Sequence, residues 1–203
     1  MKIWLLLLLL SSAVWAQPRN YVTRAEWGSQ PQALGDDLLH TPERITLHHS
    51  GVLWKAGDDA RKKIKGLQNW GQREKNWPDL PYHFLIDPQG TIFEGRELKY
   101  RPESNTDYDL TGVVNLHLWG NFDEQTVTRE QLQATVELLA WLRDQFQLET
   151  LQAHCQAAPG QTSCPGKDLM RYLDAGLLRH WVEQCRQEEW PGVKELPAPP
   201  GKP

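Results

Sequence analysis

Histidine and cysteine side chains gather where short apolar runs of the chain end. The pair His48-His49 ends one such run, and His154 directly follows the run Leu148–Ala153. Cys164 comes shortly after His154, across a loop broken by a Pro-Gly pair and just before another Pro-Gly pair. Imidazole nitrogen and thiolate sulfur are donors that zinc takes in a tetrahedral site, and three protein ligands leave the fourth position open for catalysis. These residues therefore indicate a catalytic zinc site.

Two alternatives stay open from the residues alone. Neighbouring side chains on a strand point to opposite faces, so only one of His48 and His49 can face a given site, while the other packs or caps. Cys164 can also form a disulfide with Cys155 or Cys185, because proteins of oxidising compartments usually pair their thiols. The chain has three cysteines, so at least one has another use or no partner.

Residues 1–16 have the pattern of a secretory signal peptide, with Lys2 before an apolar run at 3–10 and a small-x-Ala end at Ala16. The run is much shorter than the roughly 20 apolar residues of a membrane span. An uncleaved anchor is the alternative. We expect export to the periplasm, or secretion, of a mature chain that begins at Gln17 and has no membrane span.

Composition narrows the class of protein further. The formal net charge is −4 with no long basic run, which argues against a nucleic-acid partner. Residues 17–185 suit one domain, and 186–203 form a Pro-rich tail that we expect to be disordered. Ten tryptophans are many for this length, and some are expected to line a groove where aromatic faces pack against sugar rings. Nothing in the sequence argues for an oligomer, so we expect a monomer.

Strand-like and helical patterns alternate after an irregular arm at 17–44. Apolar runs flank the turn Asp87–Gly90 and predict a β-hairpin, and Thr128 begins a capping box before a long amphipathic run. The predicted strands are 45–49, 81–86, 91–94, 112–119 and 148–153, and the predicted helices are 58–76, 128–146 and 166–181. This order predicts an α/β fold with a mixed central β-sheet of about five to six strands flanked by helices.

Six short motifs support a family resemblance. They are Arg24–Gly28, Ile45–Ser50, Pro81–Ile86, Gly90–Arg96, Leu118–Phe122 and Ser163–Leu169. In this order, across about Tyr21 to Leu178, they resemble the type 2 N-acetylmuramoyl-L-alanine amidases and the related peptidoglycan recognition proteins. The resemblance implies the fold of that family and zinc-dependent hydrolysis of the amide between N-acetylmuramic acid and L-alanine in peptidoglycan or muropeptides.

The resemblance also implies roles for individual residues. His48, His154 and Cys164 match the zinc ligands, and Tyr82 matches the tyrosine beside the metal. Cys155 would then be free to pair with Cys185.

Two further residues are candidates for the chemistry. Thr162 stands where phage amidases have a lysine, as in the catalytic animal recognition proteins, and would add a hydrogen bond to the oxyanion. His117 lies on the central strand at the position where, by the resemblance, the cell-wall-recycling amidases carry a catalytic glutamate. It is therefore a candidate proton shuttle, and the alternative is a buried structural histidine.

Three residues are candidates for substrate binding. Trp54 follows the loop after the first predicted strand, while Arg96 and Asn121 end neighbouring strands. Arg96 suits a peptide carboxylate because its guanidinium binds carboxylates in a bidentate way. The alternative reading of the whole chain is a module that binds peptidoglycan without cleaving it.

Overall fold

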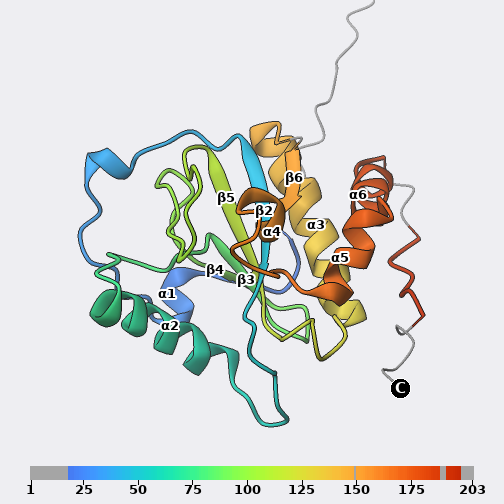
Figure 1. The fold of residues 1–203 in the computed structure, drawn as a ribbon, viewed down its shortest axis with the longest axis horizontal. Helices are drawn as coiled ribbons and strands as arrows, with labels where there is room; N and C mark the ends of the chain where they lie inside the picture. Colours follow the sequence, from blue (N-terminus) through green and yellow to red (C-terminus); the bar gives the residue numbers. More distant parts are fainter. Residues whose placement is uncertain (1–17, 149, 188–190, 198–203) are drawn as a thin grey trace, which may run out of the picture.

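The computed structural model describes residues 18–148, 150–187 and 191–197 (Figure 1). The expected signal peptide lies outside these residues. No helix in the described ranges combines the length and the apolar character that a membrane crossing requires.

A six-stranded mixed sheet forms the centre of the protein, in the order β1-β4-β3-β5-β2-β6. β2 is parallel to β5 and β6, β5 is parallel to β3, and the β3–β4 pair is antiparallel, as the predicted hairpin requires. The strands are β1 Tyr21–Val22, β2 Arg44–His49, β3 Phe84–Ile86, β4 Ile92–Glu94, β5 Val113–Leu118 and β6 Thr150–Ala153. The predicted α/β fold class is confirmed.

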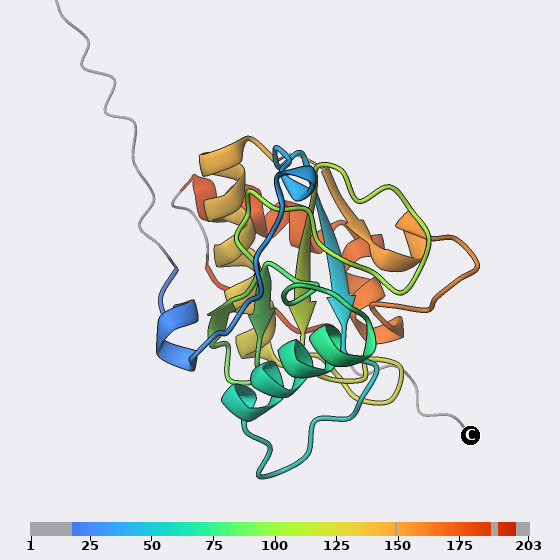
Figure 2. The same ribbon diagram turned by 90° about the vertical axis from the view of Figure 1, so that its left-hand side faces the viewer.

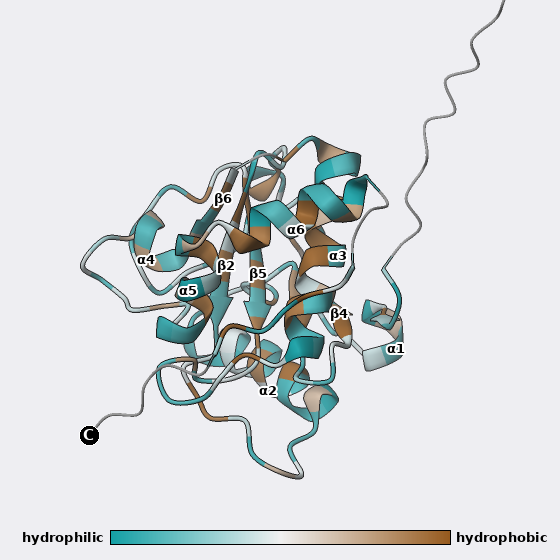
Figure 3. Ribbon diagram, turned by 90° about the vertical axis from the view of Figure 1, so that its right-hand side faces the viewer, coloured by the Kyte–Doolittle hydropathy of each residue, from teal (hydrophilic) through white to brown (hydrophobic). Residues whose placement is uncertain are grey.

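Helices cover both faces of the sheet. The helices are α1 Arg24–Trp27, α2 Ala60–Glu74, α3 Arg129–Phe146, α4 His154–Ala157, α5 Lys167–Asp174 and α6 Leu177–Arg186, with a 3-10 turn at Asp36–Leu38. Figures 1 and 2 show α3, α5 and α6 on one face and α2 on the other. Figure 3 shows hydrophobic and hydrophilic segments alternating along α3 and α6, as expected of helices that bury one side.

The alternation of side chains along β2 separates the apolar core from the site. Ile45 and Leu47 belong to the larger core, which α3, α5 and α6 cover. His48 lies between Leu47 and His49 and therefore points to the opposite face, toward α2. A smaller apolar cluster, which includes Ile64 of α2, lies on that face.

The predicted helix at 166–181 is two helices, α5 and α6. Gly176, between them, has φ of 68°, in the left-handed region. A glycine in this conformation commonly ends a helix, because it adopts the left-handed region without a Cβ clash. The apolar periodicity continues across the break and conceals it in the sequence.

The amino-terminal arm is more ordered than its composition predicts. It contributes β1 to the edge of the sheet and forms α1. The side chain of Thr23 accepts a hydrogen bond from Glu26 N, and the Glu26 carboxylate accepts one from Thr23 N. This capping box is a recognisable Thr-x-x-Glu signal in the sequence.

Part of the Pro-rich tail packs against the domain, contrary to the expected disorder. Val193 is buried in the larger core, and Leu196 N donates to the Tyr172 hydroxyl over 3.1 Å. Arg171 also donates to Pro197 O. The apolar side chains within the tail explain the packing, since they can join the core beside α5. The parts of the tail at 188–190 and 198–203 lie outside the described residues.

Candidate metal centre and active site

His48 presents one ring nitrogen to the site and uses the other to hold its orientation. Its ring is 2% exposed. Nε2 lies 3.0 Å from Asn115 Oδ1, and because an amide oxygen only accepts, Nε2 must carry the proton. Nδ1 is then a lone-pair donor that faces Cys164.

His154 is held in the same way from another part of the chain. It is the first residue of α4, directly after β6. Its Nε2 lies 2.6 Å from Thr106 Oγ1 and 3.5 Å from Ser104 Oγ. A metal-ligating histidine commonly uses its second nitrogen for such a hydrogen bond, which fixes the ring.

Cys164 reaches the two histidines from the loop before α5. Its Sγ lies 3.8 Å from His48 Nδ1 and accepts a hydrogen bond from His49 N over 3.3 Å. The loop packs tightly there, because a Cβ on Gly166 would lie 2.7 Å from the Phe122 carbonyl carbon. Glycine is therefore required two residues after the thiol.

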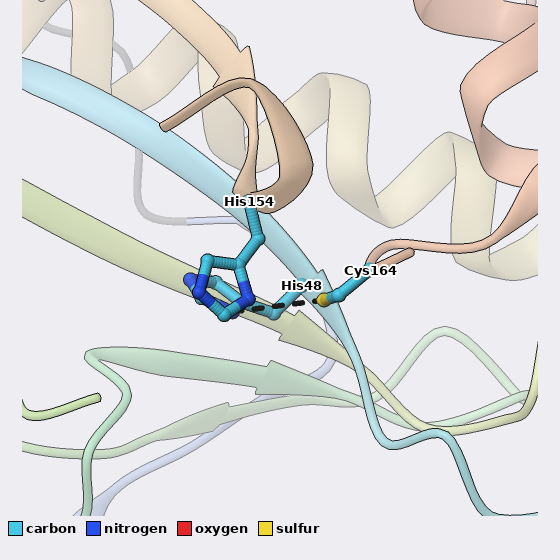
Figure 4. A group of neighbouring side chains, drawn as sticks. All are labelled: His48, His154 and Cys164. Atoms are coloured by element: carbon cyan, nitrogen blue, oxygen red, sulfur yellow. Dashed lines mark hydrogen bonds between the residues drawn. The ribbon is translucent and has the colours of Figure 1, made fainter. Parts of the chain in front are cut away.

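The three donors fit a single metal ion. Figure 4 shows His48, His154 and Cys164 pointing toward one another. Their ligand atoms all lie within 4.8 Å of one another. Zinc bonds to nitrogen and sulfur of the usual lengths place two tetrahedral ligand atoms about 3.5 Å apart. The geometry and the donor types therefore fit zinc with small adjustments of the side chains.

Burial sets the protonation of these groups in the protein without metal. It lowers the pKa of His48 well below its usual value and that of His154 to about 4, so both imidazoles are neutral and able to ligate. Burial raises the pKa of Cys164 to about 12, and the hydrogen bond from the His49 backbone opposes this effect. A bound cation would offset the cost of the buried thiolate.

His49 has the packing role that the sequence left open for one member of the pair. Its Nδ1 accepts a hydrogen bond from Phe122 N over 3.2 Å. Its ring also lies beside Phe122, with 6.0 Å between the ring centroids. The side chain of His49 thus supports the loop after β5, on the face opposite His48.

Tyr82 and His117 lie beside the histidine ligands, with their rings tilted against one another. The Tyr82 ring centroid is 5.2 Å from that of His48 and 4.4 Å from that of His117. Burial raises the pKa of the Tyr82 phenol, so it stays protonated and able to donate a hydrogen bond. Burial lowers the pKa of His117 to about 3, and neither of its ring nitrogens has a protein partner within the described residues. Both residues therefore have hydrogen-bonding capacity left for water or a ligand.

Thr162 lies two residues before Cys164, half-buried at the edge of the site. Its Oγ1 accepts a hydrogen bond from Cys164 N over 3.0 Å. This bond shapes the loop that carries the thiol.

An aromatic groove extends from the metal centre along α2. A pocket of about 80 Å³ is lined by His48, Tyr82 and His154 on one side and by Leu67 and Trp70 on the other. A second pocket, of about 290 Å³, shares Leu67 and Trp70. The remaining residues that line this second pocket are Ser50, Val52, Leu53, Trp54, Lys63, Gly66 and Trp119. The structure thus brings Trp54 to the groove, as its candidate role requires.

Arg96 does not face the groove, which corrects the role expected from the sequence. Its side chain is buried and donates to Arg101 O over 2.6 Å and to Asp79 O over 3.1 Å. It also lies 3.4 Å from the Glu103 carboxylate. These bonds use the guanidinium to hold loops behind the site, so it is not available to a substrate carboxylate.

Asn121 shapes the loop after β5. Its Nδ2 donates to Glu124 Oε1 over 2.8 Å, and its Oδ1 accepts from Asp123 N over 3.2 Å. Asn121 is absent from the lining of both pockets described above. The structure therefore gives no support to its expected contact with substrate.

The expected disulfide between Cys155 and Cys185 is absent, and both residues are free thiols. Cys155 Sγ lies 3.9 Å from Met170 Sδ. Cys185 is buried on α6 within the larger core. Each sulfur therefore packs among apolar side chains instead of forming a covalent bond.

Four residues of the site were missed from the sequence. Asn115 and Thr106 hold the two ligand histidines, Ser104 supports His154, and Tyr108 lies 5.5 Å from the His154 ring. Asn115 carries a partial signal, because it is an amide next to apolar residues in strand β5, two positions before His117. The other three lie in a loop without a pattern that would identify them.

The fold and the site define a class of α/β protein, with a candidate His-His-Cys metal centre beside an aromatic groove. Residues 39–167 match the family described as N-acetylmuramoyl-L-alanine amidase. The match covers more than half of the chain, which therefore belongs to that family. This confirms the resemblance found in the sequence.

Relatives connect the chain to peptidoglycan-related proteins. Peptidoglycan-recognition protein SD of Drosophila melanogaster is 30% identical over 168 residues, which cover 79% of this chain and 84% of that protein. The crystal structure of Drosophila peptidoglycan recognition protein SD matches with a TM-score of 0.67 at 29% identity, over 86% of this chain and 96% of that one. The N-acetylmuramoyl-L-alanine amidase LysC from Clostridium intestinale has the same fold, with a TM-score of 0.63 at 22% identity, over 77% and 96% of the two chains.

Proposed function

We propose that this protein is a zinc-dependent amidase that hydrolyses the bond between N-acetylmuramic acid and L-alanine in peptidoglycan or muropeptides. The observation that carries the proposal is the convergence of His48, His154 and Cys164, whose ligand atoms lie within 4.8 Å of one another. Zinc bound there would supply Lewis-acid chemistry, which polarises a carbonyl and lowers the pKa of water toward about 7.

Tyr82 is the residue we assign to the substrate carbonyl. In the reaction a water oxygen bonds to the carbonyl carbon, the carbon–nitrogen bond breaks, and the L-alanine nitrogen leaves as an amine with an added proton. The Tyr82 phenol is protonated and its ring lies beside that of His48, where the hydroxyl can donate to the developing oxyanion. A single placed donor of this kind is worth roughly 3–4 kcal/mol of transition-state stabilisation.

His117 and Thr162 are the candidates for moving the proton to the leaving amine. His117 is neutral at working pH, its ring lies beside that of Tyr82, and its ring nitrogens have no partner among the described residues. It can accept a proton at one nitrogen while it releases one from the other, as a relay does. Thr162 is held beside Cys164 by its hydrogen bond to the Cys164 backbone and can orient water there.

The groove beside the centre suits a glycan with a peptide branch. Trp54, Trp70 and Trp119 supply broad aromatic faces in neighbouring pockets. Such faces bury apolar area while polar groups at the rim fix orientation. One solved relative, Drosophila PGRP-LB, is described in complex with tracheal cytotoxin, so a relative of this fold binds a ligand. We propose a muropeptide or glycan strand as the partner here, and export of a domain spanning 17–185 to the compartment that holds it.

A binding module without catalysis is the second candidate, because the relative at 30% identity is named a recognition protein. The two functions are separated by incubating the purified protein with intact sacculi and with soluble muropeptides. An amidase releases free stem peptides that begin with L-alanine, and a chelator stops the release. A recognition module binds both substrates and leaves them intact.

A further inference from the structure

We propose that Asn115 is the positioning residue that fixes the Nε2–H tautomer of His48 and so presents Nδ1 as the metal donor. The inference rests on the metal site of the proposed function. It concerns a residue of the central strand that lies behind the ligands and touches neither substrate nor metal.

The place of Asn115 in the sheet puts it directly behind His48. In the register of β2 and β5, Thr46 pairs with Asn115 and His48 pairs with His117. Side chains two residues apart on a strand share a face, so Asn115, His117 and His48 all face the site. Asn115 is fully buried, with 0% exposure.

The amide of Asn115 cannot turn over, because both of its ends are committed. Nδ2 donates to Pro81 O over 3.2 Å and to Glu103 O over 3.4 Å. Carbonyl oxygens only accept, so a reversed amide would place its own oxygen against two acceptors. Oδ1 must therefore face His48, where it accepts from Nε2 over 3.0 Å and from the Tyr108 hydroxyl over 3.4 Å.

The backbone of Asn115 is fixed as firmly as its side chain. Asn115 N donates to His83 Nδ1 over 2.9 Å, and Asn115 O accepts from His83 N over 2.9 Å. The His83 ring is itself held by Tyr100 O, which lies 3.0 Å from Nε2. The acceptor atom that faces His48 is thus anchored at both the main chain and the side chain.

Asn115 also joins the segments that carry the rest of the site. Pro81 directly precedes Tyr82, and Glu103 directly precedes Ser104 in the loop that holds His154. The Asn115 amide therefore sets the tautomer of His48 and also hydrogen-bonds the segments that carry Tyr82 and the loop beside His154.

The test measures zinc affinity of the full chain by competition with a chromophoric chelator. Asn115→Leu keeps the branched shape of the side chain and removes the acceptor, and we expect the zinc dissociation constant to rise about 10- to 100-fold, the usual effect of removing such a partner. Asn115→Asp keeps an acceptor for His48 Nε2 but loses the donors to Pro81 O and Glu103 O, so its zinc affinity should lie between those of Asn115→Leu and the wild type. Thr46→Val is the matched control, because Thr46 is equally buried in the neighbouring strand but accepts from Gln152.

A second measurement needs no variant. Nitrogen-15 NMR of the metal-free wild-type protein should show His48 protonated at Nε2 and unprotonated at Nδ1. A proton on Nδ1, or an Asn115→Leu affinity within twofold of the wild type, would overturn the inference. Neither readout depends on turnover. Asn115-dependent zinc binding by a protein that leaves muropeptides intact would overturn the amidase and uphold the role of Asn115.

Discussion

His48 Nδ1 lies 3.8 Å from Cys164 Sγ, although 116 residues separate them in the chain. The contact joins the end of strand β2 to the loop before helix α5. Without a cation, burial keeps both imidazoles neutral and the thiol protonated, and forming the thiolate that a metal needs is costly there. A divalent ion removes that cost, so the predictions below begin with the thiol.

Replacing the thiol should abolish metal binding while the fold is kept. In Cys164→Ser we expect zinc to be lost on dialysis and amidase activity to fall below detection, because the hydroxyl is a much weaker ligand than thiolate. Metal analysis and circular dichroism check this. Cys155→Ser removes a thiol outside the site and should retain zinc. Full activity in Cys164→Ser would refute the ligand assignment.

Removing the phenolic hydroxyl of Tyr82 should slow turnover without releasing the metal. We expect Tyr82→Phe to lower kcat by about 100-fold, since an oxyanion donor is lost while the ring still packs on His48. Steady-state kinetics with a defined muropeptide measure the effect. Tyr172 of α5 is the control, because its hydroxyl accepts a hydrogen bond from Leu196 N of the tail. Tyr172→Phe should leave kcat unchanged. An unchanged kcat in Tyr82→Phe would remove the residue from the mechanism.

Truncating the shared wall of the two pockets should weaken substrate binding. Trp70 lines both pockets and is 40% exposed, so Trp70→Ala removes contact area with little cost to the core. We expect KM to rise several-fold, about 1 kcal/mol or more, with a smaller change in kcat. Phe146→Ala, a similarly exposed aromatic residue on α3, serves as control. If KM stays the same in both variants, the groove is not the binding site.

The metal-free protein should lose stability as the pH falls from about 6.5. Burial lowers the pKa of His83 and His117 to about 3 and that of His154 to about 4. When the pH is below the usual histidine pKa of about 6.5, these histidines bind protons in the unfolded chain but stay neutral in the native state. The free energy of unfolding therefore falls with decreasing pH, by about 1.4 kcal/mol per pH unit for each such group.

Urea unfolding of the metal-free protein at pH 7, 6 and 5 measures this slope. His117→Leu should reduce the pH dependence of the unfolding free energy by the contribution of one histidine. It should destabilise the protein little at pH 7, because the lost nitrogens have no partner among the described residues. Equal stability at pH 7 and pH 5 would contradict the buried, neutral state of these histidines.

Local patterns in the sequence predicted the elements that carry the ligands. The strand-like run that ends at His48-His49, the hairpin around Asp87–Gly90 and the capping box at Thr128 each depend on neighbouring residues. The structure contains all three features. His48 and Cys164 lie within short family motifs, and His154 directly follows a predicted strand, so these local features together indicated the centre.

Features that depend on distant contacts were not predictable in the same way. Arg96 is of a residue type that often binds carboxylates. Its partners in this protein, Asp79 O and Arg101 O, are identified only from the folded loops. The tail at 191–197 has a composition typical of disordered segments, but Val193 packs into the larger core. Asn115 stands out as an amide in β5, but its role toward His48 depends on the register with β2, which no local pattern encodes.

Mass spectrometry of the products from a defined muropeptide, with the zinc-loaded and the chelator-treated protein, decides whether the protein is a zinc-dependent amidase. We predict a free peptide beginning with L-alanine and a separate N-acetylmuramic acid product, formed only with zinc. Recovery of the intact muropeptide from the zinc-loaded protein, bound but uncleaved, would contradict it.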